Sequence, residues 1–300
     1  MDFKTLKANS GKNLSKLTDE LNKVSGATTK GKDERFWQAA VDKAGNGMAV
    51  IRFLDAPSGE DVPFVRLFEH GFKGPTGLWY IEKSLTTLGK DDPVAEFNTK
   101  LWNSTTDDAS PERKQARDQK RRVHYISNIL VVSDPANPEN EGKVFLFKYG
   151  KKIFDRLCEK AKPDFADETP INPFDMWSGA PFKLKIRKVD GYTNYDKSEF
   201  GEAGPIGDDK LIEKVWKSCH SLQEFVDPST FKSHADLKDR LYKVLGLNDN
   251  ANIKRSVKAE SVTLDEDDAP SFKATHAPNQ SGSDDDDEDE SIEFFKSLAN

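Results

Sequence analysis

The residues best suited to chemistry with a charged polymer lie in the stretch Lys120–Lys152. It opens on a basic triplet, Lys120-Arg121-Arg122, continues through aromatic and apolar residues, and ends on a lysine pair. Cations can neutralise phosphates and aromatic rings can stack on bases, so this combination is typical of a surface that binds a nucleic-acid strand. An ordinary antiparallel strand pair with a solvated basic edge would have the same composition, and the stretch alone does not separate the two interpretations.

The elements that would position these residues are two strand-like runs. Ile126–Val132 and Val144–Tyr149 are rich in β-branched and aromatic residues, and the polar loop Asp134–Gly142 separates them. This pattern predicts an antiparallel pair. An earlier run, Met48–Leu54, follows a Gly-Asn-Gly turn signal and predicts another strand. It contains Arg52, which we expect to be exposed on a sheet face because burying a charge is costly.

A second basic surface is predicted near the strand Phe182–Val189. Its apolar residues alternate with Lys183, Lys185 and Arg187, which predicts one packed face and one basic face. The turn that follows carries Tyr192 and Tyr195 beside this strand. Core packing explains a pair of tyrosines on a turn less well than it explains the strand's own apolar residues.

Further strands are predicted at Phe64–Phe68 and Leu78–Glu82, and the pattern is then lost from Lys83 to Gln119. The run Pro111–Tyr125 holds six cations against two acids, although such a run is usually a solvated face. Apolar periodicity predicts helices over residues 153–161, 211–219 and 237–245. Ser233 is the expected N-cap of the last helix and Gly246 its stop signal.

Charge is distributed unevenly along the chain, whose formal net charge is −7. Residues 251–300 hold 13 acidic and 5 basic residues, including seven consecutive acids at Asp284–Glu290, so the rest of the chain is close to neutral. Residues 1–33 hold seven lysines against four acids, with a short apolar stripe from Leu14 to Val24. The layout predicts a basic arm, a folded core and a disordered acidic tail.

Several classes of protein are disfavoured by what the sequence lacks. No apolar run reaches the ~18–20 residues of a membrane helix, and the N-terminus has no signal-peptide core, so we expect a soluble, unsecreted protein. The only cysteines, Cys158 and Cys219, have no metal-binding spacing and are expected to be free thiols. The chain has no dinucleotide, Walker-type, metalloprotease or nucleophile-elbow motif. A nucleic-acid hydrolase using scattered carboxylates stays open as the alternative.

Specific segments resemble a known family. VIRFL (50–54), EHGFK (69–73), WYIE (79–82), NILVVSDPANPENEGKVF (128–145), GKK (150–152) and DGYTNYDKSEF (190–200) stand in the order found in the single-stranded-DNA-binding, helix-destabilising proteins of T-even-type bacteriophages. The resemblance is strong over residues 42–200, and the division into arm, core and tail fits the whole chain. The ENEGKVF segment is the most specific part of the match.

The resemblance implies an α+β fold. Its core would contain an OB-fold, a five-stranded β-barrel-like structure, with an added β-lobe and helices. The core would span residues 26–250, after a basic arm at 1–25 for cooperative self-association and before an acidic tail at 251–300. The family has no catalytic activity, so the protein is expected not to be an enzyme. The implied DNA-binding residues, with adjoining lysines, are Arg52, Trp102, Lys120, Arg121, Arg122, Tyr125, Phe147, Lys148, Lys151, Tyr192 and Tyr195.

The resemblance also bears on metals. Well-known members hold a structural zinc ion with one histidine and three cysteines. Here His70 remains, whereas Ser84, Asp92 and Ala95 stand at or near the cysteine positions. A structural zinc site normally needs four ligands, so we predict that the zinc is lost and that no cofactor is present. Two positions where the family has groove tyrosines are Asp91 and Ala116 here, which implies fewer stacking rings.

The two ends of the chain have separate expected roles. Lys4, Leu6 and Lys7 lie in a segment that loosely matches the family's self-association motif. In the tail, the acids Asp284, Asp285, Asp286 and Asp287 would compete with DNA for the groove, and Phe294 and Phe295 would bind phage replication and recombination proteins. A purely solubilising tail is the alternative. The implied function is cooperative, sequence-nonspecific coating of single strands in phage replication, recombination and repair, in the cytoplasm of the infected bacterium. Whether Tyr125 and Phe147 face DNA or the core stays open.

Overall fold

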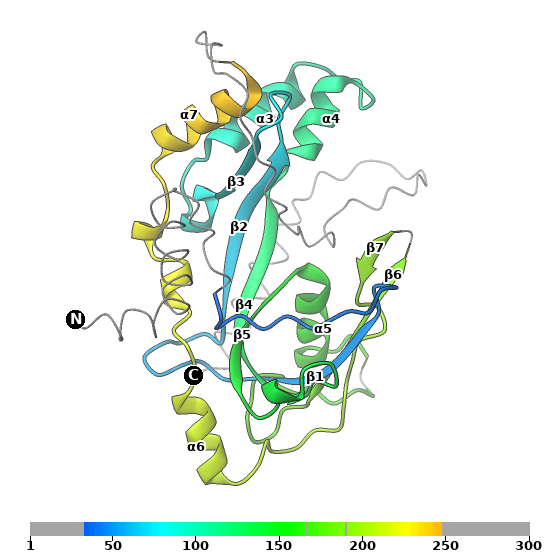
Figure 1. Ribbon diagram of the computed structural model, residues 1–300. Helices are drawn as coiled ribbons and strands as arrows, with labels where there is room; N and C mark the ends of the chain where they lie inside the picture. Colours follow the sequence, from blue (N-terminus) through cyan, green and yellow to red (C-terminus); the bar gives the residue numbers. More distant parts are fainter. Residues whose placement is uncertain (1–32, 166, 190, 248–300) are drawn as a thin grey trace, which may run out of the picture. The chain divides into compact units, whose positions relative to one another are not determined.

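The computed structural model describes residues 33–165, 167–189 and 191–247 (Figure 1). By its internal contacts the chain divides into two units, Met1–Phe36 and Trp37–Asn300. All strands and helices of the described residues belong to the second unit. The first unit contributes only residues 33–36 to the description, where Arg35 forms an ion pair with Asp33.

Strand β4, Arg122–Ser133, is the centre of the sheet (Figure 1). Its first half pairs with β2 (Phe64–Lys73), and its second half pairs with β1 (Gly47–Phe53). Its other edge pairs with β5 (Val144–Tyr149) along six residues. The antiparallel pair predicted around the loop 134–142 is therefore confirmed, and β4 extends beyond it to join two parts of the sheet.

The sheet continues in both directions with antiparallel partners. Strand β3 (Trp79–Lys83) lies beyond β2, and β6 (Phe182–Val189) lies beyond β1. Short strands β7 (Tyr192–Asn194) and β8 (Glu199–Phe200) both pair with β6. The predicted alternation in β6 is confirmed, because Phe182, Leu184 and Ile186 are buried while the intervening cations are not.

Five α-helices occur in the described residues: α3 (Pro93–Asn103), α4 (Pro111–Asp118), α5 (Lys151–Ala161), α6 (Asp209–Lys217) and α7 (His234–Leu245). The 3-10 turns there are η1 (Leu85–Leu88), η2 (Pro138–Asn140), η3 (Gln223–Phe225) and η4 (Pro228–Thr230). The sheet curls around α5 (Figure 1). The mixed α and β class is confirmed, with an antiparallel sheet.

The limits of α7 follow the predicted signals. The Ser233 side chain accepts a hydrogen bond from Asp236 N, and Gly246 ends the helix at φ 71°, in the left-handed region that glycine adopts most easily. Helices α3 and α4 lie where the sequence pattern is lost. Each begins with a side-chain cap followed by proline, Asp92-Pro93 and Ser110-Pro111.

Three apolar clusters hold these elements together. The largest fills the space between β1, β4, β5, β6 and α5 and contains Phe53, Tyr125, Phe154 and Phe182. A second cluster joins the far ends of β2 and β3 to α3 and α7 and includes the stacked rings of Phe72 and Tyr80. A third packs α6 against β1 and β4. Both cysteines are free thiols, as expected, and each is partly buried.

Candidate nucleic-acid interface

Cations and rings are combined where β4 begins. The Arg121 guanidinium lies 4.2 Å from the centroid of the Phe68 ring, and the Arg66 guanidinium lies 5.0 Å from the same centroid. Phe68 is held in place because β2 pairs with β4 there, Phe68 opposite Val123 and Glu69 opposite Arg122. Its ring is only 6% exposed, so it supports the two guanidinium groups and offers no face to a base. Lys120, just before the strand, is exposed. Of the basic triplet, Arg122 lies within this strand pairing, and Lys120 and Arg121 directly precede it.

A second cluster of this kind surrounds Trp102 on α3. The Trp102 side chain is 41% exposed, and the guanidinium groups of Arg113 and Arg117 lie 4.4 Å and 6.0 Å from its ring centroid. Arg113 Nε donates to Thr105 O, 3.1 Å away, and Arg113 also forms an ion pair with Asp108. A tryptophan flanked by arginines presents both a stacking surface and positive charge. We call Trp102, Arg113 and Arg117 the tryptophan–arginine cluster.

The hairpin of β6 and β7 carries the second predicted basic surface. Tyr192 is 51% exposed at the start of β7 and pairs with Val189. Arg187 forms an ion pair with Asp196, and Lys185 forms one with Glu199 at 2.8 Å. Exposed ion pairs such as these contribute at most about 1 kcal/mol, so a phosphate can compete for the cations. Tyr195 is only partly buried, and its ring packs on the main apolar cluster.

Lysines on β5 and α5 form ion pairs with neighbouring carboxylates. Glu69 on β2 forms an ion pair with Lys148 and lies 3.5 Å from His124 Nε2, so this carboxylate links three strands. Burial and the neighbouring Lys148 lower the pKa of His124 to about 4, which keeps the ring neutral. Lys151 begins α5 and lies 3.2 Å from Asp155. The α5 N-cap residue, Gly150, provides no side-chain hydrogen bond.

Two aromatic residues predicted at the interface lie in the core. Tyr125 is 0% exposed and stacks on Phe154 with the ring centroids 3.8 Å apart. Phe147 is buried against Trp37 and Phe53. A buried ring offers no face to a base, so both belong to the packing of the fold. The sequence left open whether Tyr125 and Phe147 face DNA or the core, and both side chains are buried in the core.

The expectation that Arg52 is exposed is wrong, because its side chain is only 2% exposed. Its Nη2 donates to the carbonyl oxygens of Asp175 (2.8 Å) and Gly204 (2.9 Å). Burial lowers the pKa of Arg52, and the nearby Asp175 carboxylate opposes that shift. Arg52 therefore ties two distant segments to β1, and we leave it out of the proposed interface together with Tyr125 and Phe147.

The residues at the family's zinc positions form a buried hydrogen-bonded group. His70 Nε2 lies 3.2 Å from Asp92 Oδ1, and His70 Nδ1 lies 3.0 Å from Gln119 O. Asp92 Oδ2 accepts hydrogen bonds of 3.0 Å from Ser84 Oγ and from Leu85 N. Burial raises the pKa of Asp92, but the hydrogen bond and charge interaction with His70, together with those two donors, outweigh it and bring the pKa to about 2.

This group does not match the one-histidine, three-cysteine set of the family. Ala95 carries no ligand atom, and its backbone N–H donates to Asp92 instead. The polar atoms of His70, Ser84 and Asp92 bind one another and the surrounding backbone. Within the described ranges, no three histidine, cysteine or carboxylate side chains form a group that could hold a metal ion. The loss of zinc stays a prediction.

Several interface residues were missed or given too little weight from the sequence. Arg66 lies in a segment that the sequence analysis predicted as a strand but did not consider for binding, although it is a cation within that strand. Arg113 and Arg117 were interpreted as part of a solvated face. The predicted residues of both termini, Lys4, Leu6, Lys7, Asp284, Asp285, Asp286, Asp287, Phe294 and Phe295, lie outside the described residues.

Comparison with known proteins identifies the family. The model of the family described as "gp32 DNA binding protein like" matches residues 45–245, which is more than half of the chain, so the chain belongs to this family. Its relatives include the single-stranded DNA-binding protein of Enterobacteria phage T4, 39% identical over 246 residues, which are 78% of each chain. The protein of the same name from Enterobacteria phage T2 is 38% identical over 247 residues, again 78% of each chain. A third, from Escherichia phage SV14, is 40% identical over 101 residues, 31% of this chain and 87% of that protein. No helix in the described part is both long and apolar enough to span a membrane.

Proposed function

We propose that the protein binds single-stranded DNA without sequence preference and coats it during phage replication, recombination and repair. The observation that carries this proposal is the tryptophan–arginine cluster, in which an exposed ring lies beside two guanidinium groups. Membership of the gp32-like family supports it independently. The site of action would be the cytoplasm of the infected bacterium, as for any protein that coats replicating phage DNA.

Each kind of side chain has a separate task in the proposed mechanism. Lys120, Arg121 and Arg122 neutralise phosphates, with help from Lys148 and Lys151. An uncapped helix N-terminus also favours anions, so the first turn of α5 suits a phosphate. The rings of Trp102, Tyr192 and Tyr195 stack on bases, each contributing roughly 1–3 kcal/mol. Since every base has a flat face, such stacking tolerates any sequence.

The finer architecture belongs to this proposal. We assign an OB-fold to β1, β4, β5 and β6 with their neighbours, supported by the antiparallel pairing and by the curled sheet around α5 (Figure 1). The division into arm (1–25), core (26–250) and tail (251–300) rests on the charge pattern. The arm, through Lys4, Leu6 and Lys7, would join neighbouring copies. The tail would compete with DNA for the groove and bind other phage proteins.

We propose that the protein binds DNA without catalysing a reaction and holds neither zinc nor another cofactor. In place of a metal, the buried group of His70, Ser84 and Asp92 would hold β2 to η1 and α3. Preferential binding to unpaired strands would shift duplex melting by mass action, with no bond made or broken. A metal-dependent nuclease is the alternative that the test below addresses.

The test is a fluorescence titration of the full chain with poly(dT), poly(U) and duplex DNA at two salt concentrations. We expect quenching of tryptophan fluorescence, tightest binding to poly(dT), and weaker binding at the higher salt concentration. A labelled single strand should stay intact with Mg²⁺ present. Degradation of the strand would favour the nuclease, and preference for poly(U) would indicate an RNA-binding protein.

A further inference from the structure

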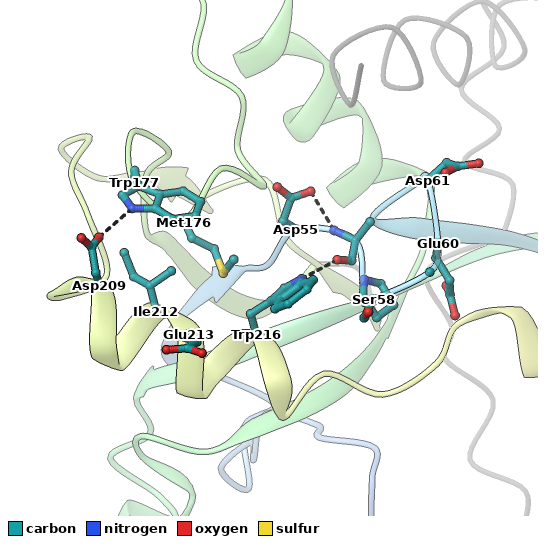
Figure 2. Close-up of a pocket in the computed structure, with 13 residues that line it drawn as sticks. Asp55, Ser58, Glu60, Asp61, Met176, Trp177, Asp209, Ile212, Glu213 and Trp216 are labelled. Carbon is teal, nitrogen blue, oxygen red and sulfur yellow. Dashed lines mark hydrogen bonds between the residues drawn. The ribbon is translucent and has the colours of Figure 1, made fainter.

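A cavity of about 640 Å³ lies beside α6, and none of the residues assigned to DNA binding lines it (Figure 2). Its apolar lining includes Met176 and Ile212, which are buried, and Trp177, which is 52% exposed. Trp216 Nε1 donates to Ala56 O at 2.9 Å, which holds the loop after β1 against the helix. The volume falls within the ~300–1,000 Å³ range of pockets that bury a small ligand.

The charged residues that line this cavity all have the same sign. No lysine, arginine or histidine of the described ranges lines it, and its five carboxylates belong to Asp55, Glu60, Asp61, Asp209 and Glu213. Figure 2 shows Asp209 at one end, beside Trp177, and Glu60 and Asp61 at the other. Negative charge is therefore spread along an apolar cavity. We call the cavity lined by these carboxylates and by Met176, Trp177, Ile212 and Trp216 the acidic pocket.

The carboxylates of the acidic pocket differ in how far the fold already uses them. Glu60 accepts hydrogen bonds from Leu222 N, and Glu213 forms an ion pair with a lysine one turn further along α6. Among the described residues, Asp55 pairs with no cation. Burial, together with the nearby charge of Asp175, raises the pKa of Asp55. A cation in the pocket would offset this excess of negative charge.

The spacing and sign of these charges narrow the choice of ligand. Within the described residues, no three histidine, cysteine or carboxylate side chains form a group that could hold a metal ion, so the carboxylates do not converge on one point. Phosphates would be repelled, which excludes nucleotides and DNA. A fitting ligand has several cationic groups along a chain, with apolar groups between them. The exposed face of Trp177 can contact either kind of group.

We infer that the acidic pocket binds a linear aliphatic polyamine. Alkylamines of the lysine type have a pKa of about 10, so the nitrogen atoms of such a molecule are charged at neutral pH. Its ammonium groups meet Asp55 and the carboxylates at the two ends, and its methylene groups lie on Met176 and Ile212. This inference goes beyond the proposed function and does not rest on it, because the pocket needs no DNA to bind a polyamine.

Nuclear magnetic resonance of the full chain tests the site directly. Protein labelled with ¹⁵N at tryptophan gives one indole N–H signal for each of its five tryptophans, assigned by single Trp→Phe variants. Spermidine, a triamine, is then added at about 0.15 M salt, where exposed charges are screened. We expect saturable shifts of the Trp177 and Trp216 signals and none of Trp79 or Trp102. Equal shifts of all five signals, or no shift, would overturn the inference.

Two variants test whether both charge and the aromatic ring contribute. Asp55→Asn keeps the Oδ1 atom that accepts the Ala56 N–H, and it should weaken spermidine binding by ~10-fold because a charged contact is lost. Trp177→Ala, followed through the Trp216 signal, should weaken it by ~3- to 10-fold. The control is Asp239→Asn, at an exposed residue of α7 outside the pocket, which should match the unchanged chain. If D55N or W177A binds spermidine as D239N does, the inference is overturned.

Two other cations separate the shape of the ligand from its charge. Hexaamminecobalt(III) has the same charge as spermidine but is compact and has no methylene groups. We expect it to need at least a ~10-fold higher concentration to shift the Trp177 signal, because it cannot use the apolar lining. Equal potency would reduce the pocket to a general acidic surface and overturn the inference. Tighter binding of tetralysine than of spermidine would also overturn it, by assigning the pocket to a basic peptide.

Discussion

At the scale of single residues, exposure separates the side chains that can meet DNA from those that build the fold. Trp102 and Tyr192 are exposed, whereas Tyr125, Phe147 and Arg52 are buried. The family resemblance implied all five as DNA-binding residues, and the sequence does not show which of these side chains point outward. The partners of Arg52 illustrate the reason: they are carbonyl groups 123 and 152 positions further along the chain.

Replacing Trp102 with alanine should weaken binding to a short oligonucleotide by roughly 1–3 kcal/mol, the contribution of one stacked base. Stability should change little, because the ring is partly exposed. The matched control is Trp79→Ala, another partly exposed tryptophan, on β3. Equal affinity of the two variants in a fluorescence-anisotropy titration would contradict the role given to Trp102.

Replacing Arg52 with alanine should lower the stability of the protein and leave its DNA binding unchanged. Gly204 O would lose the hydrogen bond from Arg52, and Asp175 O would keep only the one from Gly179 N, at a total cost of roughly 1–3 kcal/mol in the free energy of unfolding. Urea denaturation measures this loss, and the DNA affinity of the folded protein should stay the same. A stable R52A variant with weakened DNA binding would instead return Arg52 to the interface.

His124 gives the stability of the protein a pH dependence. Its pKa is lowered to about 4 in the folded state, from an ordinary value of about 6.5. The unfolded chain therefore binds a proton first, so stability is greatest above pH ~6.5 and falls by on the order of 3 kcal/mol as the pH drops toward 4. In urea denaturation at several pH values, H124Q should lack this decline. An unchanged decline in H124Q would assign it to other groups.

At the scale of elements, the sequence predicted the strands and helices whose own residues show a regular apolar pattern. Strand β6 shows clean alternation, and α5 and α7 have a clear apolar face, so their positions agree with the sequence. Helix α4 was missed because it is short and polar. Helix α3 is as long as α5, but only Pro93 and Val94 at its start are buried, so no apolar stripe runs along it. Strand β4 is buried along most of its length, so its sequence could not show which residues face the main cluster.

The lobe formed by the ends of β2 and β3 with α3 and α7 should not depend on metal. We expect a chelator to leave the melting temperature and DNA affinity unchanged, and metal analysis of protein purified without chelator to find no stoichiometric zinc. Stoichiometric zinc would contradict this expectation.

Asp92 should matter greatly to the same lobe, because it caps α3 and accepts buried hydrogen bonds from Ser84 and Leu85. Asp92→Ala should lower the free energy of unfolding by roughly 2–4 kcal/mol. Asp91 is exposed and provides the control, since Asp91→Ala should change the free energy of unfolding by less than about 0.5 kcal/mol. Similar stabilities of the two variants in urea would argue against the hydrogen-bonded group as the support of the lobe.

At the scale of the whole molecule, charge is divided between a basic arm, a core of nearly neutral sum and an acidic tail. The local field, not the net charge of −7, decides where a DNA strand can bind. This division was readable from the sequence, because charge runs need no knowledge of the fold. The cavity lined by Asp55, Asp209 and Glu213 could not be predicted, because these carboxylates come from the loop after β1 and from α6, and only the fold brings them together (Figure 2).

The central claim is that cations and exposed rings bind a single strand together. Its most direct test is the affinity of the full chain for a short oligo(dT), measured by tryptophan quenching over a series of salt concentrations. With about four phosphates neutralised, log K should fall against log[salt] with a slope near −3, and substantial affinity should persist at high salt through stacking. An affinity that does not change with salt, or equal affinity for duplex DNA, would contradict the account.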